Sequence, residues 1–371
     1  MTSLHGDVLT PTGWIRGRLD ADAASGRIAA IHGAAVTEAE VRSTSEALLI
    51  PGFVDLHVHG GGGADIMDGA DAARTVAATH LRTGTTTLLA TTMTAPRAEL
   101  ERAFAGIAAV SQQQGAEAYI AGVHLEGPFI SEAKLGAQPN FTRAVTLDEV
   151  AALHSIVPIR VLTLAPDVPG QAEVIPALTA IGIRVQLGHT DATYENARAA
   201  LAAGATGFTH LFNAMSGLHH RAPGVAGAAL AHAAHAEIIP DLLHVHPGAI
   251  RVALRCIAGL YCVTDSTAAA GMPDGEYRLG RQLVTRCMGG VRLADGTLAG
   301  SVLTMEQAFR NLVNVLGLDL AEASRRTATV AADYVGLHDR GRLAVGAVAD
   351  VLTLDRDLTL RSVMRAGRLC D

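Results

Sequence analysis

Short apolar runs alternate with alanine-rich runs through most of the chain, starting at Leu48. Eight apolar runs have the length of a buried strand: Leu48–Val58, Thr85–Ala90, Ala118–Leu125, Arg160–Leu164, Arg184–Leu187, Gly207–Leu211, Glu237–Val245 and Leu260–Thr264. The runs between them predict helices at Asp71–Arg82, Arg97–Gln114, Leu147–His154, Gln171–Ile181, Tyr194–Ala203 and Pro247–Ala258. This alternation predicts an α/β fold with a parallel sheet, and eight strands favour a closed (β/α)8 TIM barrel. An open doubly wound sheet is the alternative, but no Gly-x-Gly-x-x-Gly motif follows an early strand.

The two ends of the chain differ in style from the middle. Residues 1–48 alternate short β-like runs with Gly and Asp turns, which is typical of hairpins. After the eighth strand, 276–300 is β-rich, and helices are predicted at Val302–Leu316 and Leu320–Thr329. The tail then returns to short strands at Val351–Leu354 and Ser362–Met364. We therefore expect 1–48 and 340–371 to form one small β-sandwich domain, with the barrel, 49–339, inserted between them.

Composition narrows the choice of partners and compartment. Of the 371 residues, 49% are hydrophobic and 18% are charged, which supports a large buried core. The net charge of −7, with no cluster of Lys and Arg, argues against nucleic acid as a partner. The four cysteines form no Cys-x-x-Cys pair and suit a reducing cytoplasm. We see neither a signal peptide nor an apolar run of membrane-spanning length, so no membrane association is expected.

Imidazoles and carboxylates lie at six of the eight predicted strand ends. In a barrel these ends converge on the face that carries the active site. His57 and His59 are two residues apart in a strand and therefore point to the same side. The other ends supply Glu126, His189, His210, His244 with His246, and Asp265. Each member alone is a weak signal, since two histidines at a strand end are often ordinary, but the set predicts one polar site.

Nitrogen and carboxylate donors together suit Zn²⁺, Fe²⁺, Mn²⁺ or Co²⁺ better than Mg²⁺. Glu126, His189 and His210 would give three ligands with room for water, the pattern of a catalytic metal. His57 and His59 could hold a second ion, with Glu126 bridging, so we expect one or two divalent ions. Such a site acidifies water and polarises a carbonyl, and Asp265 could move the proton. The alternative for Asp265 is a helix N-cap before Ser266–Ala269.

A basic loop of His219, His220 and Arg221 follows the sixth strand. It is either a solvated loop or an anion site, because imidazolium and guanidinium donors suit phosphate. His244 is the better candidate for substrate contact, whereas His246, just before Pro247, is expected to have no role.

Several of these segments resemble N-acetylglucosamine-6-phosphate deacetylases of the amidohydrolase superfamily. They are Pro51–Gly63, His124-Leu125-Glu126-Gly127-Pro128-Phe129, Leu187-Gly188-His189-Thr190, Thr209-His210-Leu211-Phe212-Asn213-Ala214-Met215 and Val263-Thr264-Asp265. The tail, Gly341-Arg342-Leu343 with Gly346 and Ala349-Asp350, is similar to the closing segment of that superfamily. The resemblance covers nearly the whole chain.

The resemblance implies hydrolysis of N-acetyl-D-glucosamine 6-phosphate to D-glucosamine 6-phosphate and acetate, in amino-sugar catabolism and cell-wall recycling. It implies metal ligation by Glu126, His189 and His210, with His57 and His59 matching members that carry a second ion, and Asp265 as general base and acid. The implied substrate contacts are Ala137, Gln138, Asn213, Ala214, Arg221, Asp241, Leu242, Leu243, His244, Leu298, Ala299 and Gly300. Arg221 and His244 would bind the phosphate, with Arg221 donated across a homodimer interface.

The sequence also departs from the family's pattern. Gln138 stands where some members have His, and Leu242-Leu243 replaces a more usual Gly-Leu. No lysine sits at a strand end in the position of a carbamylated bridge, which weakens a dihydroorotase or hydantoinase interpretation. Alternative functions are N-acetylgalactosamine-6-phosphate deacetylation, deamination of a heterocycle, and a non-catalytic homologue that binds metal or sugar phosphate.

Overall fold

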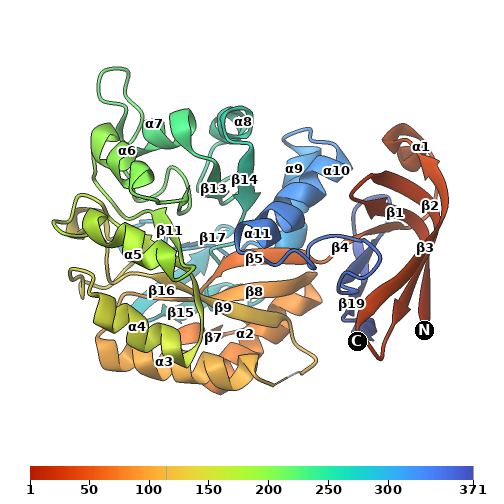
Figure 1. The fold of residues 1–371 in the computed structure, drawn as a ribbon, viewed down its shortest axis with the longest axis horizontal. Helices are drawn as coiled ribbons and strands as arrows, with labels where there is room; N and C mark the ends of the chain where they lie inside the picture. The colour runs from red at the N-terminus through yellow and green to blue at the C-terminus, as the bar shows by residue number, and fades with distance from the viewer. Residues whose placement is uncertain (114, 371) are drawn as a thin grey trace.

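Eight parallel strands form the barrel in the computed structural model, which describes residues 1–113 and 115–370 (Figure 1). They are β5 (Phe53–Val58), β8 (Thr85–Thr92), β9 (Tyr119–Glu126), β10 (Ile159–Leu164), β11 (Arg184–Leu187), β12 (Gly207–Phe208), β13 (His235–Ile238) and β14 (Gly259–Cys262). The first six form one ladder in chain order, and β13 pairs with β14. Backbone hydrogen bonds of 2.9 Å close the ring, from Leu211 N to Glu237 O and from Asp265 N to His57 O. The predicted TIM barrel is confirmed.

Helices cover the outside of the barrel, so its strands are buried on both faces and need apolar side chains throughout. They are α2 (Ala70–Arg82), α3 (Arg97–Ser111), α4 (Leu147–Ile156), α5 (Ile175–Ala180), α6 (Tyr194–Ala202), α7 (Gly224–His232), α8 (Pro247–Cys256), α9 (Met305–Asn314), α10 (Leu320–Ser324) and α11 (Val330–Tyr334). Side-chain caps fix several starts; the Thr193 hydroxyl, for example, accepts from Asn196 N at the start of α6. Short 3-10 turns lie at Ile66–Asp68, Glu132–Lys134 and Ala172–Val174, and a π-helical turn, Arg325–Thr329, joins α10 to α11.

Several predicted elements of the barrel have different bounds, and three of the differences have a clear position in the chain. The helix expected over Gln171–Ile181 begins at Ile175, because Pro176 is accommodated only in the first turn. The helix expected over Arg97–Gln114 ends at Ser111, and Gln114 lies outside the described residues. The strand expected over Glu237–Val245 ends at Ile238, because Pro240 has no N–H to donate to the ladder.

A second sheet, of seven strands, joins the two ends of the chain in the order β20-β19-β18-β4-β1-β2-β3. The strands are β1 (Thr2–Thr10), β2 (Gly13–Asp22), β3 (Arg27–Val36), β4 (Leu48–Pro51), β18 (Val351–Leu354), β19 (Leu360–Arg365) and β20 (Arg368–Cys370), with helix α1 (Glu38–Arg42) before β4. It curls, so that Arg27 bridges to Val348, and encloses a core that includes Val8, Leu49 and Val351. It stands apart from the barrel at the right of Figure 1.

The long apolar run at Leu48–Val58 proves to be two strands that belong to two sheets. β4 pairs with β1 and β18, whereas β5 starts the barrel after Gly52. A side chain at Gly52 would place its Cβ 2.2 Å from the Thr86 hydroxyl, so only glycine fits at this crossing. We therefore propose that the small domain extends through Pro51, three residues beyond the boundary expected from the sequence.

The β-rich segment after the eighth strand forms a three-stranded antiparallel sheet over one side of the barrel mouth. Its strands are β15 (Gly275–Leu279), β16 (Gln282–Cys287) and β17 (Gly290–Arg292). Leu279, Val284 and Val291 pack with Met93 and Ala269 in a separate apolar cluster. Two further two-residue strands, β6 (Gly60–Gly61) and β7 (Ala64–Asp65), form a small turn after β5. Among the described helices, none has both the length and the apolar character needed to cross a membrane.

Candidate metal centre

A cavity of about 350 Å³ opens at the carboxyl ends of the barrel strands. Its lining is His59, Met93, Glu126, Ala133, Lys134, Gly136, Ala137, Gln138, His189, His210, Asn213, Ala214, His244, Asp265, Leu279, Thr297, Leu298 and Gly300. Residues at or after the ends of six strands, β5, β8, β9, β11, β12 and β14, therefore line one cavity together with residues of the segment that contains β15–β17. This is the face on which barrel enzymes carry their active sites.

Glu126, His189 and His210 converge at the floor of this cavity, although they come from β9 and from the ends of β11 and β12. Glu126 Oε1 lies 3.1 Å from His189 Nε2 and 3.0 Å from His210 Nε2, and the two Nε2 atoms are 3.0 Å apart. All three residues are buried. Two ring nitrogens facing one carboxylate oxygen at these distances form a ready three-ligand set for a divalent ion.

His57, His59 and Asp265 form an adjoining subsite that shares Glu126. The Nε2 atoms of His57 and His59 are 3.2 Å apart, and each lies 3.4 Å from Asp265 Oδ1. His59 Nε2 lies 3.1 Å from Glu126 Oε2, while His57 Nε2 lies 3.4 Å from Glu126 Oε1. The Glu126 carboxylate thus faces both subsites. No helix begins at Ser266, so the alternative of Asp265 as a helix N-cap is wrong.

The hydrogen bonds around the rings favour metal binding at the Nε2 atoms. His189 Nδ1 donates to Lys134 O at 2.8 Å, and His57 Nδ1 donates to a Glu237 oxygen at 2.9 Å. A proton held on Nδ1 leaves the Nε2 lone pair free, and it points into the cluster. An imidazole that is bonded through one nitrogen to a carboxylate or a carbonyl, with the other facing a metal, is the usual arrangement in metal sites. The donor set therefore fits one or two divalent ions of the nitrogen-binding type.

The electrostatics of the cluster favour positive charge. Burial alone would raise the pKa of Glu126, but His57, His189 and the hydrogen bonds from His189 and His210 lower it well below its usual range. Burial alone would lower the pKa of His57, but Glu126, Asp265 and Glu237 raise it well above its ordinary value. The pKa of His189 is raised for the same reason, chiefly by Glu126 against its burial. Ionised carboxylates that stabilise an imidazolium also stabilise a divalent cation in the same place.

Three of the residues that converge on the metal centre adopt a backbone conformation that residues other than glycine seldom take. The φ angles are 48° at His189, 29° at His210 and 50° at Asp265. Each such residue costs on the order of 1–3 kcal/mol and persists only where its surroundings impose it. At Asp265 they do so directly, because Asp265 N donates to His57 O at 2.9 Å and Ser301 N donates to Asp265 O at 2.7 Å. The fold thus holds these side chains toward the cavity at an energetic cost.

Seven of the twelve substrate residues expected from the family lie in the cavity lining. Ala137, Gln138, Asn213, Ala214, His244, Leu298 and Gly300 line the cavity. Ala299 is buried in the apolar cluster of Leu279, Val284 and Val291. Arg221 lies on an exposed loop and is not among the described residues that line the cavity. Gln138 is already engaged: its amide nitrogen donates to Glu126 Oε2 at 2.6 Å, and its oxygen accepts from Thr94 N at 2.7 Å.

His244 reaches the cavity from a loop, and not from a strand as expected. The Asp241 carboxylate accepts from His244 N at 2.8 Å and from His244 Nδ1 at 2.7 Å, which fixes both the turn and the ring. Leu242 between them has a φ of 68°, and Leu243 is exposed. His246 is the N-cap of α8 and accepts from Gly248 N, so it shares no strand face with His244. Burial alone would lower the pKa of His244, but Asp241 raises it, which favours a cationic ring.

The structure adds three polar residues that the sequence did not single out. Glu237, buried at the end of β13, accepts from His57 Nδ1. Asp55 joins β5 to the segment after β14 by accepting from Thr264 Oγ1 at 2.6 Å, and burial raises its pKa to about 7. Lys134 lines the cavity and pairs with Asp191 at 3.2 Å. Glu237 stands at the start of a predicted strand, away from the strand ends where site residues were expected, so the sequence did not indicate its role. For Asp55 the only signal in the sequence was its position two residues before His57.

A comparison of the sequence with models of known protein families identifies the family of this chain. The model of the amidohydrolase family matches residues 48–370. The chain belongs to the amidohydrolase family. This family is metal-dependent, and its hydrolytic chemistry agrees with the site described above.

Curated relatives of this amidohydrolase act on acetylated sugar phosphates. It is 40% identical to N-acetylglucosamine-6-phosphate deacetylase of Vibrio furnissii, over 86% of this chain and 82% of the relative. It is 37% identical to the enzyme of that name from Lysinibacillus sphaericus, over 91% of this chain and 89% of the relative. It is also 38% identical to N-acetylgalactosamine-6-phosphate deacetylase of Escherichia coli O157:H7, over 98% of this chain and 97% of the relative.

Solved structures show the same fold over the full chain. The N-acetylglucosamine-6-phosphate deacetylase of Thermotoga maritima superposes with a TM-score of 0.91 at 30% identity, covering 100% of this chain and 99% of that one. An aspartate-to-alanine mutant of the Mycobacterium smegmatis enzyme, in complex with N-acetyl-D-glucosamine 6-phosphate, superposes with a TM-score of 0.90 at 36% identity, covering 99% and 98%. The resemblance to these deacetylases inferred from the sequence is confirmed.

Proposed function

We propose that this amidohydrolase cleaves N-acetyl-D-glucosamine 6-phosphate to D-glucosamine 6-phosphate and acetate. One observation carries the proposal: Glu126, His189, His210, His57, His59 and Asp265 meet in one cavity at the mouth of the barrel. The relatives that share the fold over nearly its full length bear names of this activity. The cavity of about 350 Å³ is of a size that suits a single sugar phosphate.

The metal ligands in this proposal are Glu126, His189 and His210, with His57 and His59 available for a second ion. A divalent ion bound there would acidify water and polarise the acetamide carbonyl. The nitrogen-rich donor set suits zinc, iron, manganese or cobalt. Gln138 holds the Glu126 carboxylate in place through its 2.6 Å hydrogen bond.

Asp265 moves the proton in the proposed reaction. Its carboxylate accepts a proton from the attacking water as the oxygen forms a bond to the acetamide carbon. It then returns that proton to the amine nitrogen as the carbon–nitrogen bond breaks, which releases acetate and the amino sugar. Its Oδ1 lies 3.4 Å from both histidines of the adjoining subsite, so it faces the same point as the ligands. The backbone hydrogen bonds of Asp265 keep it in that orientation.

The phosphate of the substrate needs cationic donors at the rim of the cavity. His244 lines the cavity, and Asp241 raises its pKa, so its ring suits a phosphate oxygen. Arg221 extends from an exposed loop of its own subunit. We propose a homodimer in which Arg221 reaches the phosphate in the neighbouring subunit's cavity. Cys256, Cys262 and Cys287 are free thiols, in agreement with a cytoplasmic location, which we also propose.

N-acetylgalactosamine 6-phosphate is the second candidate substrate. The relative of that name covers 98% of this chain, against 91% and 86% for the two glucosamine enzymes compared above, at similar identity. The two sugars differ only in the orientation of the hydroxyl at C4, and the chemistry at the acetamide is the same.

Acetate release tests the proposal and separates the two sugars. The chain, loaded with each divalent metal in turn, is assayed on both N-acetylhexosamine 6-phosphates and on the unphosphorylated sugars. We expect release from the glucosamine compound with the highest kcat/KM and a large loss without phosphate. Faster turnover of the galactosamine compound would favour the second candidate, and no release from either would reject both.

A further inference from the structure

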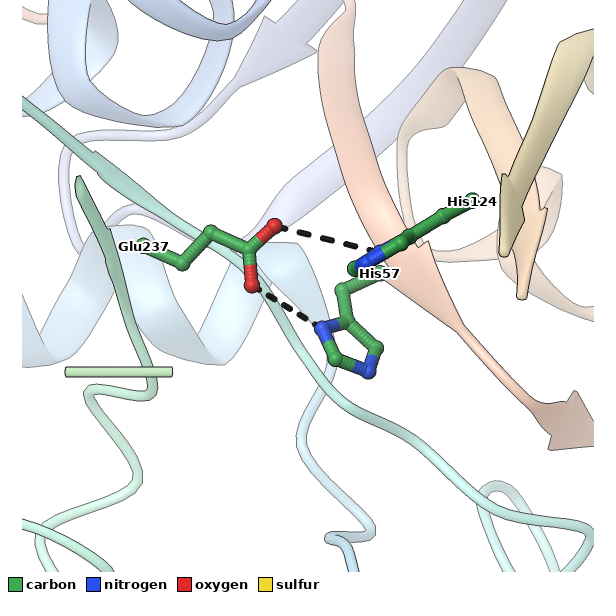
Figure 2. A group of neighbouring side chains, drawn as sticks. All are labelled: His57, His124 and Glu237. Carbon is green, nitrogen blue, oxygen red and sulfur yellow. Dashed lines mark hydrogen bonds and ion pairs between the residues drawn. The ribbon is translucent and has the colours of Figure 1, made fainter. Parts of the chain in front are cut away.

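Glu237 lies among fully buried titratable groups next to the metal centre, and the proposed reaction does not use it (Figure 2). It lies in β13, one residue before the end of the strand, while its neighbours His57 and His124 come from β5 and β9. Ligand atoms of all three lie within 4.8 Å of one another. This spacing is that of a metal-binding group, so the contacts of each member decide its role.

The contacts of His124 argue against a metal at this trio. Its Nδ1 lies 3.2 Å from Leu56 O, and its Nε2 lies 2.8 Å from Thr163 Oγ1, so both ring nitrogens have protein partners. The distance from His124 Nδ1 to Glu237 Oε1 is 3.9 Å, too long for a hydrogen bond. His57 Nδ1, by contrast, is 2.9 Å from Glu237 Oε2. The trio therefore contains one strong contact, between Glu237 and His57.

We propose that Glu237 is a positioning residue that sets the tautomer and ring orientation of His57 for metal binding. Its Oε2 accepts the Nδ1 proton, which leaves the lone pair of His57 on Nε2. Figure 2 shows this second nitrogen pointing away from Glu237. It lies 3.4 Å from both Glu126 Oε1 and Asp265 Oδ1, within the candidate metal centre. A carboxylate behind a ligating histidine also raises the basicity of the ring, which strengthens its bond to a metal.

The same carboxylate joins the two subsites. Glu237 Oε2 also accepts from His210 N at 3.1 Å, and His210 belongs to the ligand set around His189. Its Oε1 accepts from Tyr261 Oη at 3.3 Å, which fixes the plane of the carboxylate. Within the described residues, the buried Nδ1 atoms of His59 and His210 have no hydrogen-bond partner. In the subsite of His57, His59 and Asp265, His57 is thus the histidine whose tautomer the fold sets.

The inference rests on the proposed function only in requiring that this centre binds a divalent ion. It is therefore tested by metal binding rather than by turnover. Affinity for Co²⁺ is measured by competition with a chromophoric chelator, and the visible spectrum of bound Co²⁺ reports the ligand geometry. The variants are Glu237→Met, which keeps the side-chain length without the carboxylate oxygens, and Tyr261→Phe as matched control. The control removes one buried hydrogen bond to the same carboxylate but leaves the contact to His57.

Glu237→Met is expected to lose about 10–100-fold in Co²⁺ affinity and to change the Co²⁺ spectrum, the usual effect of removing such a partner. Tyr261→Phe is expected to stay within about threefold of the parent, since the bond that sets the tautomer remains. Parent-like affinity in Glu237→Met would overturn the inference. So would an equal loss in Tyr261→Phe, because the effect would then follow from any damage to this buried network.

A second variant keeps the test decisive if Glu237→Met fails to fold. Glu237→Gln retains an acceptor oxygen and removes the charge, and it is made in the parent and in a His57→Gln background. Because Glu237 acts through His57, we expect a several-fold loss in the parent and almost none in the second background. Equal losses in both would contradict the inference. A chain that binds Co²⁺ as expected but releases no acetate would reject the proposed function and leave the inference standing.

Discussion

Replacing Asp265 by Asn should stop turnover while leaving the metal centre and the fold in place. The side chain lines the cavity and is 12% exposed. Its Oδ1 lies 3.4 Å from Nε2 of both His57 and His59. Asn has the same shape and tolerates the φ of 50° at this position, so the backbone need not move. What changes is the ability to accept a proton.

The size of the loss follows from that single change. General acid–base catalysis by one side chain contributes about 10²–10⁴-fold, which corresponds to about 2.7–5.5 kcal/mol of transition-state stabilisation. Because the interaction exists only in the transition state, kcat and kcat/KM should fall together, with KM little changed. Acetate release is measured at saturating and at low substrate, and metal content is determined on the same samples.

Asp191→Asn provides the matched control. It makes the same chemical change at another strand end, but Asp191 is exposed and pairs with Lys134 at 3.2 Å. An exposed pair contributes about 0–1 kcal/mol, so kcat should change by less than about fivefold. If Asp265→Asn retained its metal and kept kcat within tenfold of the parent, the role given to Asp265 would be wrong. An equal loss in Asp191→Asn would show that the assay detects any change at this face.

Three further predictions concern other parts of the molecule. Gln138→Leu removes the 2.6 Å hydrogen bond to Glu126, and we expect weaker Zn²⁺ binding by about tenfold in a chelator competition; unchanged binding would show that Gln138 does not hold the ligand. Burial alone would raise the pKa of Asp7, but its two arginine partners lower it, so its stabilising contribution is present above the ordinary carboxyl pKa and is lost as pH falls through the lowered value. Urea unfolding between about pH 5 and 2 should therefore show a flatter pH dependence in Asp7→Asn than in the parent, and parallel curves would refute this. Arg221→Ala should lose kcat/KM on the phosphorylated sugar but regain activity when co-expressed with Asp265→Asn, because mixed dimers would contain one complete site; absence of such complementation would exclude donation across an interface.

The sequence predicted the barrel and the convergence of its strand ends because both depend on local patterns. His57 and His59 share a side through the two-residue repeat of a strand, and Glu126, His189 and His210 follow apolar runs whose ends must meet in a barrel. The parts that it missed depend on contacts between distant segments. Glu237 contacts the metal centre only because closure of the barrel brings β13 beside β12, which places the Glu237 carboxylate next to Nδ1 of His57.

Two errors came from apolar runs that look continuous in the sequence. The run through Glu237–Val245 ends early because Pro240 cannot pair, and Asp241 then turns the chain to present His244 from a loop. The run at Leu48–Val58 is divided at Gly52, where the chain passes from one sheet to the other. An apolar run indicates that a segment is buried. It does not show whether the buried segment is one strand, two strands or a packed loop.

Removal and return of the metal tests the central claim most directly. The chain is stripped with a chelator, assayed for acetate release from N-acetyl-D-glucosamine 6-phosphate, and then titrated with Zn²⁺, Mn²⁺, Co²⁺ or Fe²⁺. We expect release to vanish in the stripped protein and to recover fully with one or two equivalents of at least one of these ions. Undiminished release by the stripped protein, or none with any ion, would contradict the account.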